Sequence, residues 1–245
     1  MKTTKSGSYP PSIIPELQSY SHFWIRNHLE EIKNKPPSII YRPINKSELK
    51  EIKALHKEWF PINYSDALFD MIGSSLYSIA AVFDTKEYGE SEIIFAGLIL
   101  FRVSHNESNG FLRCTYFMQN TYSCYIITIG VIEELRCLGI GSELILRMQR
   151  QAESLIEMPL YIYLHVVVYN NEAIAFYERK GFIRAEHISD HYYIDGKFYD
   201  AYLYIFYINN AKTPIVTWEN VGKMFKSIMH FPARVKSLFV NQKIN

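Results

Sequence analysis

The chain has 245 residues, with 26 Lys and Arg against 25 Asp and Glu and a formal net charge of +1. Its 48% hydrophobic and 15% aromatic content is enough to build a packed core, which excludes a chain that is disordered throughout. A charge this close to zero gives no overall field for a polyanion, so we expect no nucleic-acid partner, and we expect a monomer.

The first 37 residues form an N-terminal extension. Residues 1–12 are rich in Ser, Thr, Lys and Pro, which indicates disorder, and they contain no apolar stretch of the kind found in secretory signals. Residues 15–33 carry apolar side chains at helical spacing up to Pro36-Pro37. We expect a helix that packs on the following domain, lengthens a membrane-facing edge or binds a partner. No window of the chain reaches the 18 uncharged apolar residues of a membrane-spanning helix.

A short strand and a helix open the next region. The strand is expected at residues 39–42, and the helix at 46–59 with Ser47 as a candidate N-cap and Pro61 as its stop. The loop of residues 60–64 contains unusually large apolar side chains. From the residues alone, a hydrophobic plug at the helix end is the favoured interpretation.

Two antiparallel strands follow, at residues 77–83 and 93–103, with a polar turn at 84–92. Gly97 predicts a site of close backbone approach within the second strand, since glycine has no side chain to pack. Residues 104–118 are polar at first and then apolar, and they predict a variable loop.

The central stretch is a strand, a loop and a helix start. Its β-branched and aromatic run begins at Tyr125 and ends before Glu133, and a helix is predicted over residues 139–156. Gly139 and Gly141 lie two apart at the helix start, where free N–H groups and the positive dipole end suit an anion. With the charge of Arg136 beside them, a pyrophosphate site is indicated.

Other interpretations of these glycines are weaker or remain open. The dinucleotide fingerprint requires a third glycine where this chain has Leu144, and no Gly-Lys-Ser/Thr follows as in a Walker loop. A glycine-tightened turn without any ligand remains an alternative.

The remaining elements complete a mixed α/β order. A strand is expected at residues 160–168, a helix at 171–180 closed by Gly181, and two strands at 182–193 and 197–208. Asp195-Gly196 between the last two strands is the signal of a type I′ hairpin.

Three motifs resemble a known family. Arg136-x-x-Gly139-x-Gly141 resembles the Q/R-x-x-G-x-G/A loop of the GCN5-related N-acetyltransferase (GNAT) superfamily, and residues 163–166, 170–178 and 181–182 resemble its last cofactor-binding segment. Trp59-Phe60-Pro61-Ile62-x-Tyr64 narrows the resemblance to the N-alpha-acetyltransferases of the NatF type. The resemblance covers roughly residues 40–210.

The resemblance implies an α/β fold, with a mostly antiparallel sheet whose middle strands splay apart between flanking helices. It implies a GNAT domain over residues 38–210 that uses acetyl-CoA as the acetyl donor and no metal. The implied acceptors are protein N-termini that retain methionine before a hydrophobic or other bulky residue. Asn63 departs from relatives that carry an acidic residue there, which puts a preference for a basic second residue in doubt.

The implied catalytic pair is Tyr125 and His165, which draw the proton from the amine through ordered water. Period-two counting places Tyr125 with Ile127, Ile129 and Val131, and His165 with Tyr161 and Tyr163, so the two side chains are expected to face one cleft. From the residues alone, a histidine among apolar strand residues is more often a core histidine.

By position in the motifs, the cofactor-binding residues fall on the central strand, the glycine loop and the later helix. They are Ile129, Gly130, Val131, Arg136, Cys137, Leu138, Gly139, Ile140, Gly141, Ser142, Asn170, Tyr177, Glu178, Arg179 and Lys180. Tyr177 has an alternative interpretation as a simple core aromatic. The substrate-binding residues fall on the apolar loop, the central strand and the last hairpin: Phe60, Pro61, Ile62, Tyr64, Ile127, Tyr192 and Tyr193.

Other polar side chains are given no part in the chemistry. Cys114, Cys124 and Cys137 form no C-x-x-C pair, which favours reduced thiols facing the cytosol. His56 and His187 show no metal-ligand spacing and are expected in solvent or in polar contacts.

The last segment, residues 211–245, has apolar residues at helical spacing and holds six Lys or Arg against one Glu, a charge of +5. It is expected to lie on a membrane as an interfacial helix, and the resemblance implies the cytosolic face of Golgi or related membranes. A helix packed on the domain itself is the alternative. Lysine (histone) acetylation and a non-enzymatic membrane tether are the competing functions.

Overall fold

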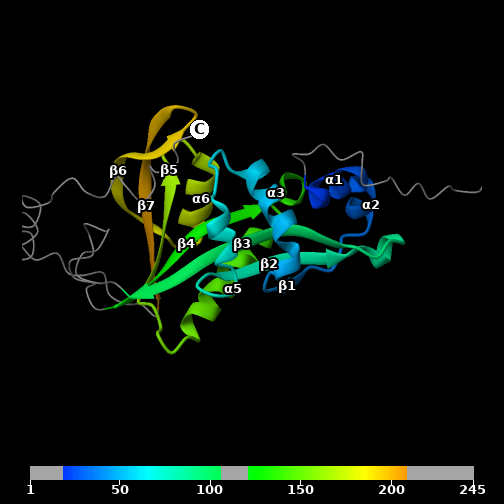
Figure 1. Ribbon diagram of the computed structural model, residues 1–245, viewed down its shortest axis with the longest axis horizontal. Helices are drawn as coiled ribbons and strands as arrows, with labels where there is room; N and C mark the ends of the chain where they lie inside the picture. Colours follow the sequence, from blue (N-terminus) through cyan, green and yellow to red (C-terminus); the bar gives the residue numbers. More distant parts are fainter. Residues whose placement is uncertain (1–18, 106–120, 209–245) are drawn as a thin grey trace, which may run out of the picture. The chain divides into compact units, whose positions relative to one another are not determined.

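The computed structural model describes residues 19–105 and 121–208 (Figure 1). Within these ranges seven strands form one sheet in the order β1-β2-β3-β4-β5-β7-β6. The described residues divide into two structural units: unit 1 holds 19–102 and 127–150, and unit 2 holds 103–105, 121–126 and 151–208. The expected mixed α/β class with a mostly antiparallel sheet is confirmed.

In unit 1 the strands β1 (Ile40–Arg42), β2 (Tyr77–Asp84) and β3 (Ile93–His105) pair antiparallel, as expected. Apolar side chains fill the middle of β2 and β3, and residues 98–101 are completely buried. Gly97 does mark a close approach: a Cβ there would lie 2.8 Å from the carbonyl oxygen of Gly130.

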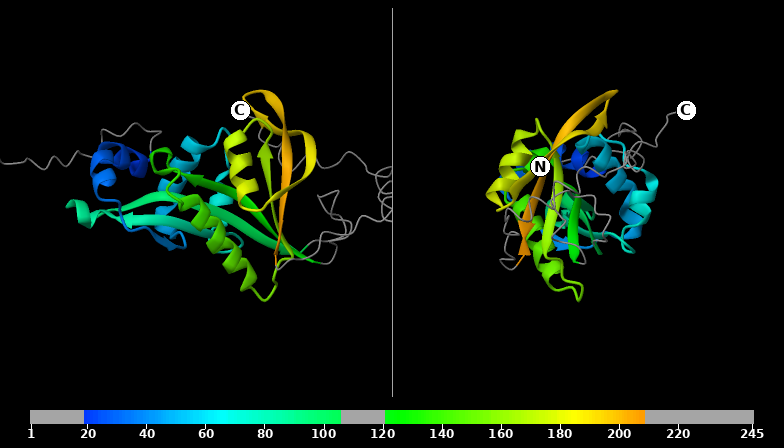
Figure 2. Two further views of the ribbon diagram at one scale, coloured as in Figure 1. Left: turned by 180° about the vertical axis from the view of Figure 1, so that it is seen from behind. Right: turned by 90° about the vertical axis from the view of Figure 1, so that its left-hand side faces the viewer.

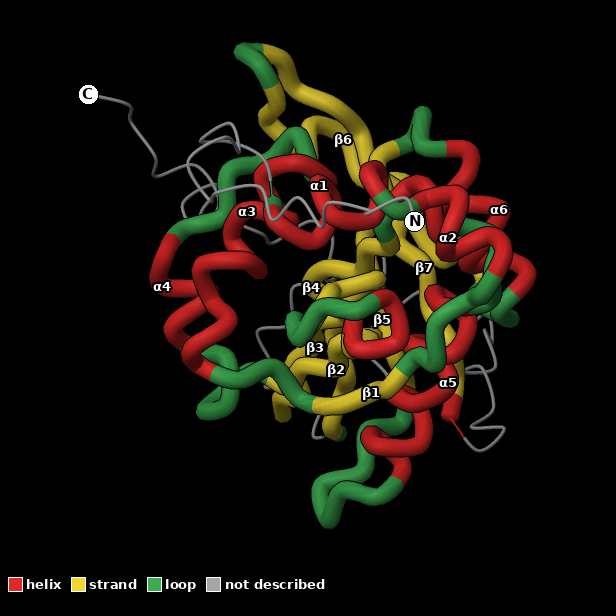
Figure 3. Tube along the Cα trace, turned by 90° about the vertical axis from the view of Figure 1, so that its right-hand side faces the viewer, coloured by secondary structure: helices red, strands yellow, loops and turns green. Residues whose placement is uncertain are grey.

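Residues 19–37, the described part of the N-terminal extension, pack on unit 1, which is one of the expected placements. Its predicted helix is two helices, α1 (Tyr20–Asn27) and α2 (Leu29–Asn34), which meet at His28. The start of α1 lies beside α3 (Leu49–Trp59) (Figure 3). There the N–H groups of Tyr20 and Ser21 donate to the carboxylate of Glu51, which suits the positive end of the helix dipole.

Buried side chains join the extension to the rest of unit 1. Trp24, Ile25 and Ile32 are core residues, and the Ser21 hydroxyl accepts a hydrogen bond of 3.0 Å from the N–H of Phe95 in β3. The His22 ring lies between two carboxylates, 2.7 Å from that of Glu58 and 3.0 Å from that of Glu134. The extension is therefore part of the folded unit.

The start of the helix region differs from the prediction. Ser47 is not the cap. Asn45 caps a short 3₁₀ turn, η2 (Lys46–Glu48), in a capping box with Glu48, and α3 continues directly from it. Two further short elements were not expected: α4 (Asp66–Asp70) after the apolar loop and the 3₁₀ turn η3 (Thr85–Tyr88) in the polar turn. A third 3₁₀ turn, η5 (Glu133–Leu135), follows the central strand.

In unit 2 the strands β5 (Tyr161–Val167), β7 (Lys197–Tyr207) and β6 (Ile183–Ile194) pair antiparallel, and α6 (Asn171–Arg179) lies beside β7 (Figure 2). Asp195 and Gly196 have φ of +48° and +80°, which confirms the type I′ turn. Gly181, with φ of +84°, closes α6 as predicted.

The central strand β4 (Tyr122–Val131) pairs with β5 in parallel over a short ladder that joins residues 123–125 to 161–163. So short a ladder between strands of ten and seven residues agrees with the expected splay. The helix α5 (Ile140–Glu153) follows the glycine loop.

Three expectations fall outside the described residues: disorder at residues 1–12, nearly all of the loop at 104–118, and the tail at 211–245. In the part of the chain that the structure describes, no helix is long and apolar enough to cross a membrane.

Candidate functional site

The structure brings the predicted catalytic pair together in unit 2. The Tyr125 hydroxyl of β4 lies 3.3 Å from Nδ1 of His165 on β5, and the two rings are 5.7 Å apart at an angle of 68°. Tyr163, the register partner of Tyr125, stacks on its ring at 4.8 Å. Neighbouring strands therefore present Tyr125, Tyr163 and His165 on one face, as the alternation predicted.

Strand β6 adds two side chains to this cluster. The ring of His191 stacks on that of His165, with centroids 4.3 Å apart and planes 25° apart. The Tyr192 hydroxyl donates a hydrogen bond of 3.1 Å to the His165 carbonyl oxygen. Tyr193 is 60% exposed and packs on Phe198 instead, so Tyr192 is the member of the predicted pair that faces His165.

The buried surroundings keep His165 uncharged. Burial, with a smaller contribution from the charge of His191, lowers the pKa of His165 to about 3, and burial lowers the pKa of His191 as well. At neutral pH both rings therefore hold a nitrogen lone pair. An uncharged imidazole has a ring nitrogen that can accept a hydrogen bond or a proton.

The two described cysteines, Cys124 and Cys137, differ in exposure. Burial raises the pKa of the Cys124 thiol to about 12, so it remains protonated and is a poor nucleophile. Cys137 is exposed in the glycine loop. In the described ranges no three His, Cys, Asp or Glu side chains are grouped as metal ligands would be.

The apolar loop of unit 1 is built around His56. The rings of Phe60, Tyr64 and Phe69 lie 5.4, 5.5 and 5.0 Å from the His56 ring. His56 is 2% exposed and makes polar contacts, which is the second of its two expected placements. Large rings from the loop and from α4 close over it, which a search for metal-ligand spacing does not detect.

Hydrogen bonds fix the protonation of His56. Its Nδ1 lies 2.8 Å from the carbonyl oxygen of Ile52, which can only accept, so Nδ1 carries the proton. Burial lowers the pKa of His56 to about 4, so the ring is neutral and its Nε2 accepts from the Thr128 hydroxyl at 3.1 Å. This bond ties α3 to β4 directly beneath the predicted substrate wall.

The other predicted wall residues differ in exposure. Tyr64 lies deep enough that burial raises the pKa of its hydroxyl to about 12. Ile62 is partly exposed, and Pro61 and Asn63 are exposed. Phe60 and Tyr64 are partly exposed as well, and they are the wall residues whose rings contact His56.

The glycine loop of unit 1 has the backbone that an anion site needs. Cys137 and Gly139 have φ of +64° and +85°, so the chain turns sharply before α5 begins. Leu138 is 66% exposed, whereas Ile140 is buried and anchors the helix start. The exposed N-terminus of a 14-residue helix fits a pyrophosphate. The Arg136 Nε donates 3.3 Å to the Val131 carbonyl oxygen, which holds this side chain near the loop.

Two of the predicted cofactor residues of unit 2, Asn170 and Tyr177, make contacts that stabilise α6. The Asn170 side chain caps α6 by accepting from the N–H of Ala173 at 3.1 Å. The Tyr177 ring is buried against Phe176 and Phe182, which is the alternative interpretation as a core aromatic.

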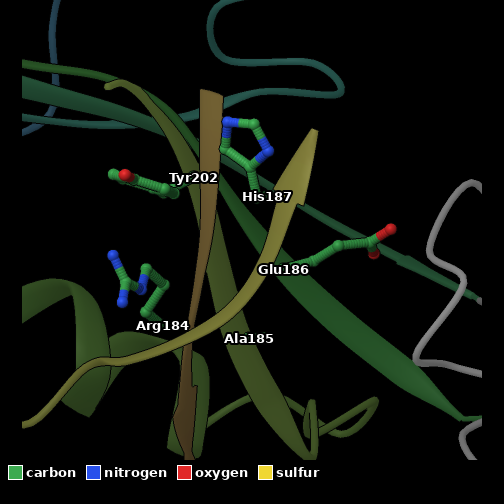
Figure 4. Close-up of a pocket in the computed structure, with 5 residues that line it drawn as sticks. All are labelled: Arg184, Ala185, Glu186, His187 and Tyr202. Carbon is green, nitrogen blue, oxygen red and sulfur yellow. The ribbon is translucent and has the colours of Figure 1, made fainter. Parts of the chain in front are cut away.

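A hollow of about 490 Å³ lies on the β6–β7 hairpin, and Figure 4 shows the residues that line it. Arg184 and His187 lie near the ring of Tyr202 on one side of the hairpin, and Glu186 points to the other side. Tyr202 is two residues before Tyr204 on β7 and shares its face of the sheet, where the Tyr204 hydroxyl donates to Glu178 of α6. His165 pairs with Leu203, which is on the opposite face. The hollow is therefore separate from the His165 cluster.

Comparisons with known proteins agree with this geometry. The model of the acetyltransferase (GNAT) family matches residues 49–182, more than half of the chain. The chain belongs to this GNAT family. Family membership confirms the superfamily that the glycine loop indicated, and it accounts for the exposed helix start after that loop.

Relatives within the GNAT family are similar over most of the chain. A protein of Arabidopsis thaliana named histone acetyltransferase MCC1 is 31% identical, covering 73% of each chain. N-alpha-acetyltransferase 60 of Xenopus tropicalis is 30% identical, covering 78% of this chain and 79% of its own. The crystal structure of Arabidopsis thaliana NAA60 in complex with acetyl-CoA is 31% identical, with a TM-score of 0.61, and covers 70% of this chain and 99% of that one. A second crystal structure of that protein contains a bisubstrate analogue.

Sequence reasoning missed His191 and His56 as neighbours of the predicted site. Counting along the sequence of β6 does not predict that His191 stacks on His165, because the register of that strand is irregular. The available signal for His56 was its position four residues after Ile52, which places both side chains on the same face of the helix.

Proposed function

We propose that this chain is an N-terminal protein acetyltransferase that moves the acetyl group of acetyl-CoA to the α-amino group of protein N-termini. The single observation that carries the proposal is the cluster of Tyr125, neutral His165 and Tyr192 on one face of unit 2. The relatives named N-alpha-acetyltransferase 60 support it, as does the glycine loop that fits acetyl-CoA. We propose that the chain acts as a monomer.

The chemistry requires an unprotonated amine near a thioester. Bound acetyl-CoA would supply the acetyl group as a thioester. The amine attacks the carbonyl carbon without a covalent enzyme intermediate, the C–S bond breaks, and coenzyme A leaves as the thiolate, which takes a proton from solvent. An N-terminal ammonium has a pKa of about 7.7 to 8.0 against about 10.4 for lysine, so a weak base suffices. His165, which is uncharged at neutral pH, accepts the amine proton through water with Tyr125 beside it and passes the proton to solvent.

The acceptor N-terminus begins with methionine, followed by a hydrophobic or other bulky residue. Phe60 and Tyr64 offer apolar rings for the methionine, and Ile62, between them in the sequence, is partly exposed. Asn63 is exposed and uncharged, so it gives no attraction to a basic second residue.

A panel of acceptor peptides tests the proposal. The full chain is incubated with acetyl-CoA and a Met-Leu peptide, its N-terminally blocked twin, or a blocked peptide with an internal lysine. We expect acetylation of the first peptide alone. The relative named histone acetyltransferase favours a second candidate function, and acetylation of the blocked lysine peptide alone would establish that one instead.

Two substitutions test the catalytic pair. Tyr125→Phe and His165→Ala should each lower turnover more than tenfold while acetyl-CoA affinity, measured by calorimetry, changes less than threefold. The motive is the 3.3 Å contact between these side chains. Wild-type turnover in the double variant would remove both residues from the mechanism.

We also propose that residues 211–245 attach the enzyme to the cytosolic face of Golgi or related membranes. The support is the sequence: an apolar helical stripe edged by basic residues, with a segment charge of +5. A fusion carrying residues 211–245 should sediment with vesicles containing phosphatidylserine at low salt, and the chain ending at residue 210 should remain active in the supernatant. Sedimentation of the shortened chain, or a tail that stays in the supernatant, would contradict the anchor.

A further inference from the structure

The strand β6 contains a bulge directly before Tyr192. Ile188 pairs with Ala201, and the next pair is Tyr192 with Tyr199, so residues 189–191 lie opposite Asp200 alone. The strand has two more residues here than its partner, which preserves the faces of the side chains but moves them along the sheet. Asp190 within the bulge has φ of +53°, a left-handed conformation that glycine adopts without strain and other residues adopt at a cost.

Asp200 holds this bulge from the opposite strand. One carboxylate oxygen accepts from the N–H of Asp190 at 3.0 Å, and the other lies 3.0 Å from Nε2 of His187. The carbonyl oxygen of Asp200 also accepts from the N–H of Val168, directly after β5, at 3.1 Å. One residue thus connects the bulge to β6 before it and to the end of the strand that carries His165.

The Asp200 carboxylate is on the opposite face of the sheet from His165. It follows the alternation of Tyr202, the face of the hollow in Figure 4, whereas His165 pairs with Leu203. The carboxylate contacts the bulge backbone and His187, so it can influence His165 on the other face only through the position of the bulge. Without the bulge, regular pairing would move His191 and Tyr192 by two residues, roughly 7 Å along the strand.

We propose that Asp200 is a positioning residue, whose carboxylate holds the 189–191 bulge so that His191 stacks on His165 and Tyr192 bonds the His165 carbonyl. The inference deepens the proposed function and rests on it for the catalytic meaning of His165. The placement itself follows from the four contacts among these residues.

Three variants separate positioning from other roles. Asp200→Ala removes both side-chain bonds. Asp200→Asn keeps an oxygen that accepts from the Asp190 N–H and loses only the charge beside His187. His187→Ala is the matched control, because it removes the 3.0 Å contact with His187 and leaves the bond to the Asp190 N–H. A fourth variant combines Asp200→Ala with Asp190→Gly, since glycine adopts a φ of +53° without strain.

The first readout is placement and needs no acceptor peptide. In the full-length chain, the ring Cε1–H signal of His165, assigned with His165→Gln, carries a ring-current shift from the stacked His191. We expect Asp200→Ala to move this signal to the position seen in His191→Leu. Asp200→Asn and His187→Ala should leave it unchanged. An unchanged signal in Asp200→Ala would overturn the inference whether or not the proposed function holds.

The second readout is turnover with the acceptor that the wild-type chain acetylates. Asp200→Ala should lower kcat/KM more than tenfold with an acetyl-CoA dissociation constant within twofold of wild type. Asp200→Asn, His187→Ala and the double variant with Asp190→Gly should stay within about threefold of wild type. If Asp200→Ala does not fold, the Asn variant decides: loss of more than tenfold there, with acetyl-CoA binding intact, would overturn a positional role.

Discussion

Gly130 lies beneath the indole ring of Trp59, and adding one methyl group at this position should loosen the predicted substrate wall. A Cβ on Gly130 would lie 2.1, 2.6 and 2.9 Å from three atoms of that ring. Nonbonded carbons prefer about 3.5 to 4.0 Å, so the ring must retreat by roughly 1.5 Å. Trp59 ends α3 and precedes Phe60, and its movement should therefore displace the wall.

Overpacking of this size costs about 2 to 3 kcal/mol, which for a chain of this length lowers Tm by about 4 to 12 °C. We expect Gly130→Ala to show this loss in thermal unfolding, together with a rise of at least fivefold in the KM for the Met-Leu peptide. The backbone at Gly130 is not left-handed, so the expected effect comes from the added volume alone.

Two further variants make the reasoning refutable. Gly73→Ala places a methyl group in open space at φ of +81°, so it should lower stability by about 1 kcal/mol without changing the peptide KM. In a Trp59→Ala background, Gly130→Ala should cost less than about 0.5 kcal/mol, because the clash is gone. Equal costs in both backgrounds, or a fully stable Gly130→Ala chain, would refute the packing argument.

Three other predictions follow from single contacts. Between pH 6.5 and 4 the unfolded chain binds a proton at His56 that the folded chain excludes. The free energy of unfolding should therefore fall by up to roughly 3 kcal/mol from this group as the pH is lowered, and in His56→Gln this fall, measured by denaturation, should be shallower. Gly141→Glu should weaken acetyl-CoA binding more than tenfold by calorimetry, and undiminished affinity would place the phosphate site elsewhere. Ser21→Ala should lower the free energy of unfolding by about 1 to 3 kcal/mol, because the buried N–H of Phe95 loses its acceptor; urea unfolding at wild-type stability would contradict this.

The order of elements was predictable because it depends on local patterns. Continuous apolar runs located β2 and β3, and Asp195-Gly196 located the hairpin turn. The face shared by Tyr125 and His165 was also predictable, because period-two counting holds along regular strands.

What the sequence did not predict depends on irregular or distant contacts. Ser47 and Asn45 are both good capping residues, and only the reach of Glu48 back to Asn45 decides between them. Counting along β6 could not tell Tyr192 from Tyr193, since the register of that strand shifts twice before them, once by a single residue between Arg184 and Glu186. His56 is buried by rings from a loop and from a helix, α4, that the sequence did not indicate.

The packing of the N-terminal extension has a practical consequence for where this domain can be cut. The family match begins at residue 49, yet Ser19 already binds Glu58, and Trp24 and Ile25 are 3% and 0% exposed. A fragment that begins at the family boundary would leave the carboxylates of Glu51 and Glu58 without their helix partners and would expose an apolar surface on unit 1. Recombinant fragments intended for crystallisation or inhibitor screening should therefore retain the chain from residue 19 onward.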